Sequence, residues 1–244
     1  MTAIQIINLT KKFKEKTAVN SLNLAIEQGE LFALLGVNGA GKTTTIKMLS
    51  CLTAPTSGDA ILLGESILTR AQSVKEKINV SPQETAVAPN LTVRENLILV
   101  AKIYGCDKDR AIKKTEEMLS AFSLQEVSKD KAKTLSGGMQ RRLSIAMALI
   151  SEPQILFLDE PTLGLDVLAR RELWKEIEKL KGKITIILTT HYLEEAQALS
   201  DRIAIMSKGE LKAVGTAEEL MNKTNTSNLE DAFVALAAGE GVER

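Results

Sequence analysis

Three near-continuous apolar runs, residues 31–35, 155–158 and 184–188, limit most strongly what this chain can fold into. A strand with apolar side chains on both faces must be covered on both faces, which is the environment of a parallel sheet between layers of helices. Shorter apolar, β-branched segments predict further strands: IQII, LNLAI, AILL, IAIM and LKAV. The pattern therefore predicts an α/β fold built on a mainly parallel sheet.

The middle of the chain, roughly residues 92–150, lacks strand signals and carries helical ones instead. Thr92 and Glu95 form a capping-box pattern ahead of an apolar stripe, and Gly105 suits the C-terminus of that helix. A second helix is predicted over residues 107–122. We therefore expect a helical subdomain inserted into the α/β core.

The last third of the chain predicts one core helix and a peripheral end. Trp174 lies within the predicted core helix, residues 168–181, and is expected to pack rather than to bind a ligand. The apolar stripe of that helix is Leu173, Ile177 and Leu180. After Gly215 the chain shows a polar loop, NKTNTSN, and then a short helix. The apolar face of this short helix comprises Leu229, Ala232, Phe233 and Leu236.

Composition excludes several classes of protein. The 244 residues carry 31 basic and 31 acidic side chains, a balance that argues against a dedicated nucleic-acid surface. Cys51 and Cys106 are too few for a disulfide scaffold and lack metal-ligand spacing, so reduced thiols in a cytoplasmic protein are expected. No signal-like segment opens the chain, and the apolar runs are far shorter than a membrane span. If the protein serves a membrane, another chain crosses it.

The segment LFALLGVNGAGKTTTIKML joins a buried strand, a loop of the form Gly-x-x-x-x-Gly-Lys-Thr and a helix. The glycines let backbone N–H groups curl around a phosphate at the start of a helix whose dipole favours negative charge. Lys42 is expected to reach the β- and γ-phosphates, and the Thr43 hydroxyl to bind Mg²⁺. The flanking strand and helix distinguish this segment from a chance match. No guanine-reading motif is visible, which favours adenine.

Two carboxylates follow the apolar strand in ILFLDEPTLGLD. Open α/β sheets bind their ligands at the carboxyl ends of the strands, where Asp159 and Glu160 lie. Asp159 is expected to hold Mg²⁺ through water, and Glu160 to face an attacking water. An acidic pair in this position is by itself usually a solvated strand end. The phosphate loop in the same chain favours the functional interpretation.

A second glycine-rich helix start lies in TLSGGMQRRLSIAMALI. Ser136, Gly137 and Gly138 precede a helical apolar stripe, an arrangement suited to holding an anion or simply to capping a helix. Arg141 and Arg142 lie in the first turn, where the helix end already carries about half a positive charge. Two cations there repel the dipole, and a bound phosphate would offset that repulsion. The sequence therefore offers two candidate anion sites. A single nucleotide would not need both of them from the same molecule.

With GVNGAGKTT, LSGGMQ, ILFLDE and GLD in this order, the chain closely resembles the ATPase subunits of ABC transporters, from about Leu9 to Leu236. In that family two ATPase domains pair head to tail. The Ser-Gly-Gly helix end of one domain, the signature motif, caps the γ-phosphate held by the phosphate loop of the other. The resemblance therefore implies that the two anion sites serve one ATP from opposite subunits, and that a two-fold axis generates two equivalent sites.

The resemblance also assigns roles to individual residues. Nucleotide binding falls to Phe13, Gly36, Asn38, Gly39, Ala40, Gly41, Lys42, Thr43, Thr44, Ser136, Gly137, Gly138 and Asp166. Catalysis falls to Glu160, His191 and Gln83, and Mg²⁺ binding to Thr43, Gln83 and Asp159. Phe13 would stack on adenine, with a core phenylalanine as the alternative. His191 would contact the γ-phosphate, and Asp166 would link the two sites across the dimer. Met139 stands where glutamine is commonest in the signature, and Lys14 where a glycine is frequent after the aromatic residue.

The implied architecture is a P-loop ATPase core with an N-terminal antiparallel β part. The core takes residues 1–84 and 151–215, the helical subdomain residues 85–150, and a C-terminal extension residues 216–244. The implied partners are a second ATPase subunit and a transmembrane permease that is gripped by a groove near residues 83–95. The subunit would lie peripherally on the cytoplasmic face of the membrane. SGGMQRRL and LEDAFVAL resemble the exporter branch associated with drugs, antibiotics, lipids, polysaccharides or sodium.

Three rival functions are weighed against these motifs. A DNA-repair or chromosome ATPase would carry a long heptad insertion, but only 53 positions separate Gln83 from Ser136. A translation-associated relative would show two motif sets in one chain, and this chain has one. A module that senses ATP without hydrolysing it would lack the base, whereas Glu160 is present. The sequence therefore favours the transport ATPase.

Overall fold

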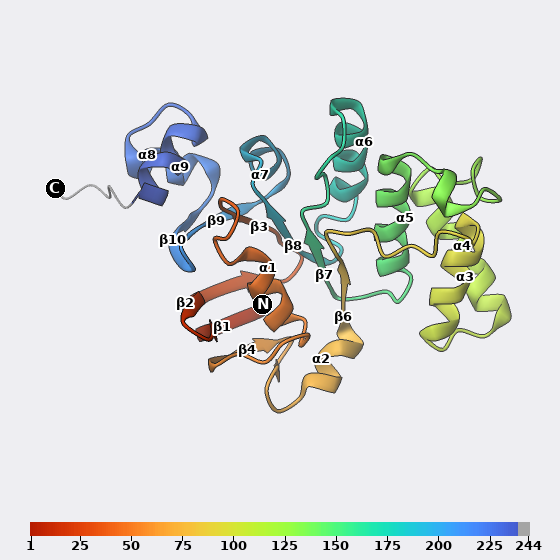
Figure 1. The fold of residues 1–244 in the computed structure, drawn as a ribbon, viewed down its shortest axis with the longest axis horizontal. Coiled ribbons are helices and arrows are strands. Elements are labelled where there is room, and N and C mark those ends of the chain that lie inside the picture. The colour runs from red at the N-terminus through yellow and green to blue at the C-terminus, as the bar shows by residue number, and fades with distance from the viewer. Residues whose placement is uncertain (239–244) are drawn as a thin grey trace.

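A six-stranded sheet forms the centre of the computed structural model, which describes residues 1–238 (Figure 1). Its strand order is β10-β9-β3-β8-β7-β6, and every pairing is parallel except that of β10 with β9. The strands are β3 (Leu31–Leu35), β6 (Ile78–Ser81), β7 (Ile155–Asp159), β8 (Thr185–Thr190), β9 (Arg202–Ser207) and β10 (Glu210–Gly215). The predicted α/β fold with a mainly parallel sheet is confirmed.

Every residue of β3, β7 and β8 is buried, as the apolar runs require. Alternate side chains of one strand enter different parts of the core, because successive residues point to opposite faces. Phe157 packs into the core shared with the N-terminal strands, whereas Leu156 and Leu158 pack among the helices of the middle segment. The strand β6 was not predicted, because its sequence INVS alternates apolar and polar residues over only four positions.

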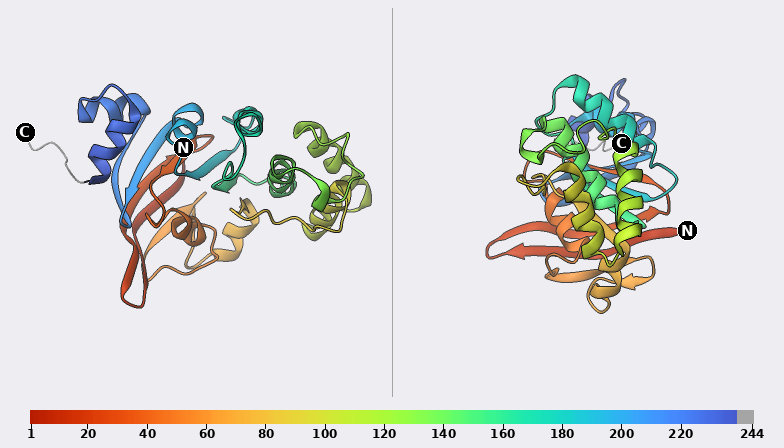
Figure 2. Two further views of the ribbon diagram at one scale, coloured as in Figure 1. Left: turned by 45° about the horizontal axis from the view of Figure 1, so that its top comes forward. Right: turned by 90° about the vertical axis from the view of Figure 1, so that its right-hand side faces the viewer.

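The second sheet is antiparallel, in the order β2-β1-β4-β5. It comprises β1 (Thr2–Phe13), β2 (Lys16–Glu27), β4 (Ser57–Leu62) and β5 (Glu65–Ser66). The apolar side of this sheet shares one core with α1 (Lys42–Leu49) and α2 (Ala71–Lys77). In Figure 2 the long β1–β2 pair stands beside the central sheet, so α1 lies at the junction of the two sheets.

The middle segment folds into helices that stand to one side of both sheets (Figures 1 and 2). These are α3 (Val93–Ile103), α4 (Lys108–Ala121), a short 3₁₀ turn (Ala132–Thr134) and α5 (Gly137–Leu149). Thr92 and Glu95 cap α3 reciprocally, and Gly105 adopts a positive φ of 80° just after that helix. Asp107 caps α4. The predicted helices are therefore present, and the boundaries of the subdomain remain a prediction.

The remaining helices are α6 (Val167–Glu178), α7 (Leu193–Leu199), α8 (Ala217–Thr224) and α9 (Leu229–Ala238). Leu220 of α8 and Leu229 of α9 are buried in one cluster with β9 and β10. The sequence predicted a polar loop where α8 ends. The missed signal is the capping box formed by Thr216 and Glu219. Part of the predicted extension, residues 239–244, lies outside the described residues.

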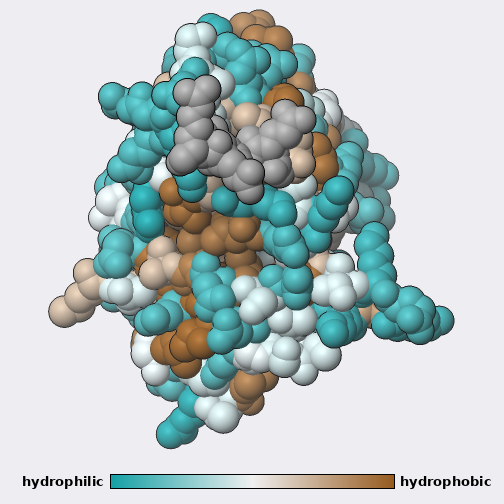
Figure 3. All heavy atoms as spheres, turned by 90° about the vertical axis from the view of Figure 1, so that its left-hand side faces the viewer, coloured by the Kyte–Doolittle hydropathy of each residue, from teal (hydrophilic) through white to brown (hydrophobic). Residues whose placement is uncertain are grey.

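Viewed from the end that carries α8, α9 and β10, the surface is largely hydrophilic around a hollow lined by apolar side chains (Figure 3). Within residues 1–238, none of the helices combines the length and the apolar character needed to cross a bilayer.

Candidate functional site

The predicted phosphate loop, the acidic pair and the histidine meet at the carboxyl ends of β3, β7 and β8. A cavity opens there between the loop before α1 and the end of β7. Its lining comprises Lys16, Ala18, Asn38, Gly39, Ala40, Gly41, Lys42, Thr43, Thr44, Gln83 and Glu160. The structure thus brings together, in one hollow, residues drawn from four distant segments of the sequence.

The loop before α1 can be closed only with glycine at two positions. A Cβ on Gly36 would lie 2.5 Å from the Met206 carbonyl oxygen. Gly41 has φ of 103°, and a Cβ there would lie 2.5 Å from the Ala18 carbonyl oxygen. The chain therefore packs tightly under the loop and turns directly into the first residue of α1. The first turn of α1 contains no acidic side chain, so its N–H groups and dipole remain available to an anion.

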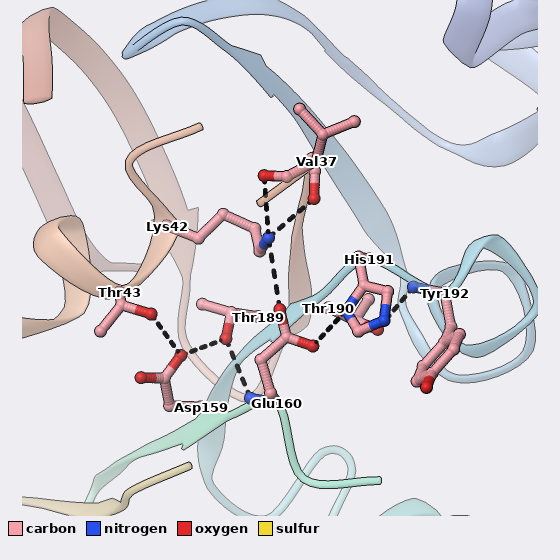
Figure 4. Close-up of polar contacts among 10 residues, drawn as sticks. Val37, Lys42, Thr43, Asp159, Glu160, Thr189, Thr190, His191 and Tyr192 are labelled. Carbon is pink, nitrogen blue, oxygen red and sulfur yellow. Dashed lines mark hydrogen bonds and ion pairs between the residues drawn. The ribbon is translucent and has the colours of Figure 1, made fainter. Parts of the chain in front are cut away.

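Lys42 lies at the floor of the cavity, with only 5% of its side chain exposed. Its ammonium donates to the carbonyl oxygens of Gly36 at 2.7 Å and Val37 at 3.3 Å, and lies 3.2 Å from Glu160 Oε1 (Figure 4). An unpaired buried charge is costly, so this ion pair accounts for the burial of both groups. The same ammonium thus contacts both the loop before α1 and Glu160.

Asp159 is held by two hydroxyl groups. Its Oδ1 accepts hydrogen bonds from Thr43 Oγ1 at 3.1 Å and Thr189 Oγ1 at 2.6 Å (Figure 4). Thr43 comes from the start of α1 and Thr189 from the end of β8, so the carboxylate joins two elements. An ionised carboxylate beside a hydroxyl supplies oxygen donors of the kind that Mg²⁺ prefers. These two oxygens could hold Mg²⁺, an ion that usually keeps water and phosphate as its other ligands.

Glu160 adopts φ of 49°, an uncommon conformation for a residue with a side chain. Its N–H donates to the Thr189 carbonyl at 3.1 Å and to Thr189 Oγ1 at 3.0 Å, which holds the backbone in this turn. Its Oε2 lies 2.6 Å from His191 Nδ1 (Figure 4). Glu160 thus lies between Lys42 and His191, aimed at the cavity rather than at solvent.

Gln83 is exposed and lines the cavity opposite the phosphate loop. Its backbone carbonyl accepts a hydrogen bond from Arg141 of α5, which also donates to the Pro82 carbonyl at 2.6 Å. Burial lowers the pKa of the Arg141 guanidinium, against the charges of Asp159 and Glu195. Arg142 points toward Glu172 instead, with a separation of 3.7 Å. Both arginines therefore turn away from the N-terminus of α5.

Six predicted nucleotide contacts are not among the residues that line this cavity: Phe13, Gly36, Ser136, Gly137, Gly138 and Asp166. Ser136 caps α5 by accepting from the Met139 N–H at 3.3 Å, and Ser136 and Gly137 are exposed. Asp166 caps α6 and accepts from the N–H groups of Leu168 and Ala169, each at 2.9 Å. Phe13 is 50% exposed at the end of β1, with the Lys11 ammonium 5.0 Å from its ring centre. The exposure of Phe13 excludes the alternative of a core phenylalanine.

Sequence reasoning missed two contributors to the site. Thr189 supports both carboxylates, and Lys16 lines the cavity next to Ala18. The signal for Thr189 is the pair of threonines that ends the apolar strand ITIILTT just before His191. Lys16 pairs with Phe13 in the β1–β2 ladder, a contact that no local pattern indicates.

Residues 19–163 match the family described as ABC transporter. The chain is 41% identical over 221 residues to the linearmycin resistance ATP-binding protein LnrL of Bacillus subtilis, covering 90% of this chain and 71% of that protein. It is 40% identical to human phospholipid-transporting ATPase ABCA3 over 91% of this chain. The chain spans only 13% of the length of ABCA3.

A solved structure with the same fold is the dimeric post-hydrolysis state of the ATP-binding cassette MJ0796 bound to ADP and Pi. The TM-score is 0.78 and the identity 27%, with 87% of this chain and 98% of that chain covered. The glycine loop, the acidic pair and the histidine of this chain thus lie on a fold that is known to hold a nucleotide. By sequence and by fold, the chain belongs to the ABC transporter ATP-binding family, among relatives that include drug-resistance and export ATPases.

Proposed function

We propose that this chain is the ATP-binding and ATP-hydrolysing subunit of a membrane exporter, and that two such subunits enclose each ATP between them. The observation that carries the proposal is the chain of contacts Lys42–Glu160–His191, in which Lys42 and Glu160 are buried beside the loop before α1. These contacts support the roles proposed for a phosphate-binding cation, a carboxylate base and an imidazole side by side.

Binding of the triphosphate falls to the loop from Gly36 to Thr44. Its N–H groups and the α1 dipole would hold the β-phosphate, and the Lys42 ammonium would exchange Glu160 for the β- and γ-oxygens. Thr43, Asp159 and Gln83 would hold Mg²⁺, which supplies charge neutralisation to the phosphates when bound. Phe13, exposed at the rim, would stack on adenine.

Hydrolysis would depend on Glu160, which is released when Lys42 exchanges its carboxylate for phosphate. Once Lys42 turns to phosphate, the Glu160 carboxylate is free to take a proton from a water aimed at the γ-phosphorus. His191 would donate an N–H to the γ-phosphate, and Gln83 would orient the water from the opposite wall. The Glu160 backbone is already fixed by Thr189, so its carboxylate needs little reorganisation.

The second subunit would complete the site through its signature motif. The exposed N-terminus of α5, Ser136 to Gly138, points its N–H groups at no acceptor in its own chain beyond the Ser136 cap, within the described residues. Across a two-fold axis this end would cap the γ-phosphate of the partner, and Asp166 would link the two sites. Loss of the γ-phosphate would then loosen the dimer.

A groove beside the helical subdomain is suited to a helix of the membrane subunit. Leu99 and Ile103 of α3 are 44% and 71% exposed, and Tyr104, which follows α3, is 49% exposed. Tyr104 lines a hollow together with Val80, Pro82, Ala86, Val100 and Met147. An exposed apolar cluster next to Pro82 and Gln83 would let a permease sense the nucleotide site. The subunit would then lie peripherally on the cytoplasmic face of the membrane.

The test is phosphate release by the chain co-purified with its membrane partner, with titration calorimetry of ATP on the isolated chain. The proposal expects Mg²⁺-dependent ATP turnover that the permease stimulates. Co-purification with ribosomes or DNA in place of a membrane protein would contradict the transport role. ATP binding without turnover in the assembled complex would make the chain a sensor instead.

A further inference from the structure

A buried glutamate lies behind the nucleotide site and has no role in the mechanism above. Glu195 belongs to α7, four residues after His191, and its side chain has no measurable exposure. Its Oε1 accepts a hydrogen bond from Trp174 Nε1 of α6 at 3.0 Å. Its Oε2 is buried without a hydrogen-bond partner within residues 1–238. A buried carboxyl oxygen without a partner is rare enough to need a reason.

The hydroxyl of Thr162 has the same unusual status. Thr162 lies two residues after Glu160, is 1% exposed, and its Oγ1 is likewise buried without a well-formed hydrogen bond. The hydroxyls of Thr162 and Thr190 lie near the Glu195 carboxyl without forming a hydrogen bond of good geometry to it. Burial raises the pKa of Glu195 and the charge of Glu160 adds to that rise, whereas the nearby Thr190 and Thr162 hydroxyls and the Trp174 N–H oppose it. On α5, Arg141 is the cation that senses the Glu195 charge.

Glu195, Thr162 and Trp174 lie on three segments, two of which also carry residues with proposed roles in the reaction. The strand end and α7 carry His191 and Glu195, the loop 160–166 carries Glu160 and Asp166, and α6 carries Trp174. The loop is itself a pair of tight turns, in which the Leu163 N–H donates to Glu160 O and the Leu165 N–H to Thr162 O. A small movement of the Thr162 hydroxyl toward Glu195 Oε2 would satisfy both unpaired atoms at once.

We propose that Glu195 is a positioning residue, whose carboxyl holds the loop 160–166 against the His191 segment through Thr162. It touches no reacting atom; it acts through the loop that orients Glu160 on one side and Asp166 on the other. The inference deepens the proposed ATPase function and rests on it. The carboxyl fits its neighbours, since Trp174 donates to Oε1, while Oε2 and the nearby Thr162 hydroxyl are both unpaired within residues 1–238.

The contacts of Glu195 with Trp174 and Thr162 determine which substitutions test its role. Glutamine keeps the shape of Glu195, accepts from Trp174 and donates to Thr162, whereas alanine removes both contacts. Thr162→Val removes the hydroxyl at nearly constant volume. Glu194→Ala is the matched control, because Glu194 is the preceding residue on α7, with 76% side-chain exposure and a surface ion pair to Arg170.

The experiment measures amide hydrogen exchange of the whole chain, followed by steady-state ATP turnover of the assembled complex. For Glu195→Ala we expect peptides covering residues 161–166 to exchange about tenfold faster, as one lost buried hydrogen bond implies. Turnover should fall about tenfold with KM for ATP unchanged, because the loop orients the base and not the phosphate loop. Thr162→Val should shift both readouts in the same direction. Glu195→Gln and Glu194→Ala should behave as the wild type.

Unchanged exchange in Glu195→Ala, or equal losses in Glu195→Gln and Glu195→Ala, would overturn the positioning role. An increase in exchange spread evenly over β3 and β7 would also overturn it, because it would indicate a general loss of stability. If the wild-type protein in the assembled complex releases no phosphate from ATP, the proposed ATPase function itself is contradicted. The exchange measurement on the nucleotide-free chain separates these two failures, since it needs no turnover.

Discussion

Two helices in this protein, α1 and α5, begin with similar glycine-rich sequences, but the N-terminus of α1 is enclosed and that of α5 is exposed. At the N-terminus of α1, the loop faces a cavity that is also lined by β2, Gln83 and Glu160, and Lys42 is paired with the buried carboxylate of Glu160. At the N-terminus of α5, Ser136 and Gly137 face solvent, and the Ser136 side chain caps its own helix by accepting from the Met139 N–H. Within residues 1–238, one glycine-rich helix start is enclosed and the other is exposed.

The arginines of α5 sharpen the contrast. The sequence predicted both arginines in the first turn, but α5 begins at Gly137, so Arg141 and Arg142 are its fifth and sixth residues and lie in the second turn. Arg141 reaches the carbonyls of Pro82 and Gln83, and Arg142 turns toward Glu172. The helix end is therefore left with its dipole and free N–H groups. Arg141 also connects the two regions, because it ties α5 to the backbone of a residue in the cavity wall.

The largest effect is expected from Glu160→Gln, in the enclosed site. Turnover should fall about 10³-fold, because the amide cannot accept the proton of the attacking water. ATP binding should persist, and the ATP-bound dimer should be visible by light scattering. Glu210→Gln is the control and should leave turnover unchanged, because Glu210 is a half-buried residue that contacts Lys212 and Asn20 away from the cavity. Turnover retained in Glu160→Gln would remove the base from the mechanism.

Lys42→Ala comes next. ATP affinity, measured by titration calorimetry, should fall about 10²-fold, because charge-assisted contacts to two phosphates are lost. Lys47→Ala is the matched control, since Lys47 lies on the same helix but is exposed. Equal affinities for the two variants would show that the α1 site does not bind the triphosphate tail.

Ser136→Arg tests the exposed helix start. ATP affinity of the isolated chain should remain within about twofold of wild type, while turnover in the complex falls about tenfold, since a bulky cation blocks the approach of a second subunit. Ser120→Arg places the same side chain on an exposed position of α4 and should change neither quantity. A loss of ATP affinity in monomeric Ser136→Arg would place both helix ends on one nucleotide within one chain.

The smallest expected effect is a difference in the free energy of unfolding between Arg141→Ala and Arg142→Ala. Arg141→Ala should lower the free energy of unfolding by about 2 kcal/mol, because the carbonyls of Pro82 and Gln83 lose a buried donor. Arg142→Ala should cost about 0.5 kcal/mol, as for other partly exposed ion pairs. Urea denaturation of both variants measures the difference. Equal losses would mean that Arg141 does not anchor α5 to the cavity wall.

Much of the enclosed region could be predicted from the sequence, because its signals are local. The apolar runs required strands buried on both faces, and the glycine loop followed by Lys42 and Thr43 predicted an anion site at a helix start. Thr92 with Glu95 predicted the start of α3 for the same reason. The roles of individual site residues remain predictions that the variants above test.

The remainder depends on contacts between distant segments. The hydrogen bonds of Arg141 to residues 82 and 83 join positions 58 and 59 apart. Thr189 meets Asp159 across the sheet at a separation of 30 residues. Short β6 and the helix α8 carried weak signals, a four-residue strand and a capping box within a polar stretch. No pattern in one chain states which molecule the N-terminus of α5 faces.

The central claim, that one ATP is held by helix ends of two chains, is tested most directly by complementation in a Glu160→Gln background. The first mixture combines a tagged Lys42→Ala chain with an untagged Ser136→Arg chain. The second mixture combines a tagged chain that carries both Lys42→Ala and Ser136→Arg with an untagged chain that carries neither change. The account predicts ATP-dependent capture in the first mixture, which contains one intact composite site per dimer, and none in the second, where each site lacks one part. Capture in the second mixture but not in the first would contradict it.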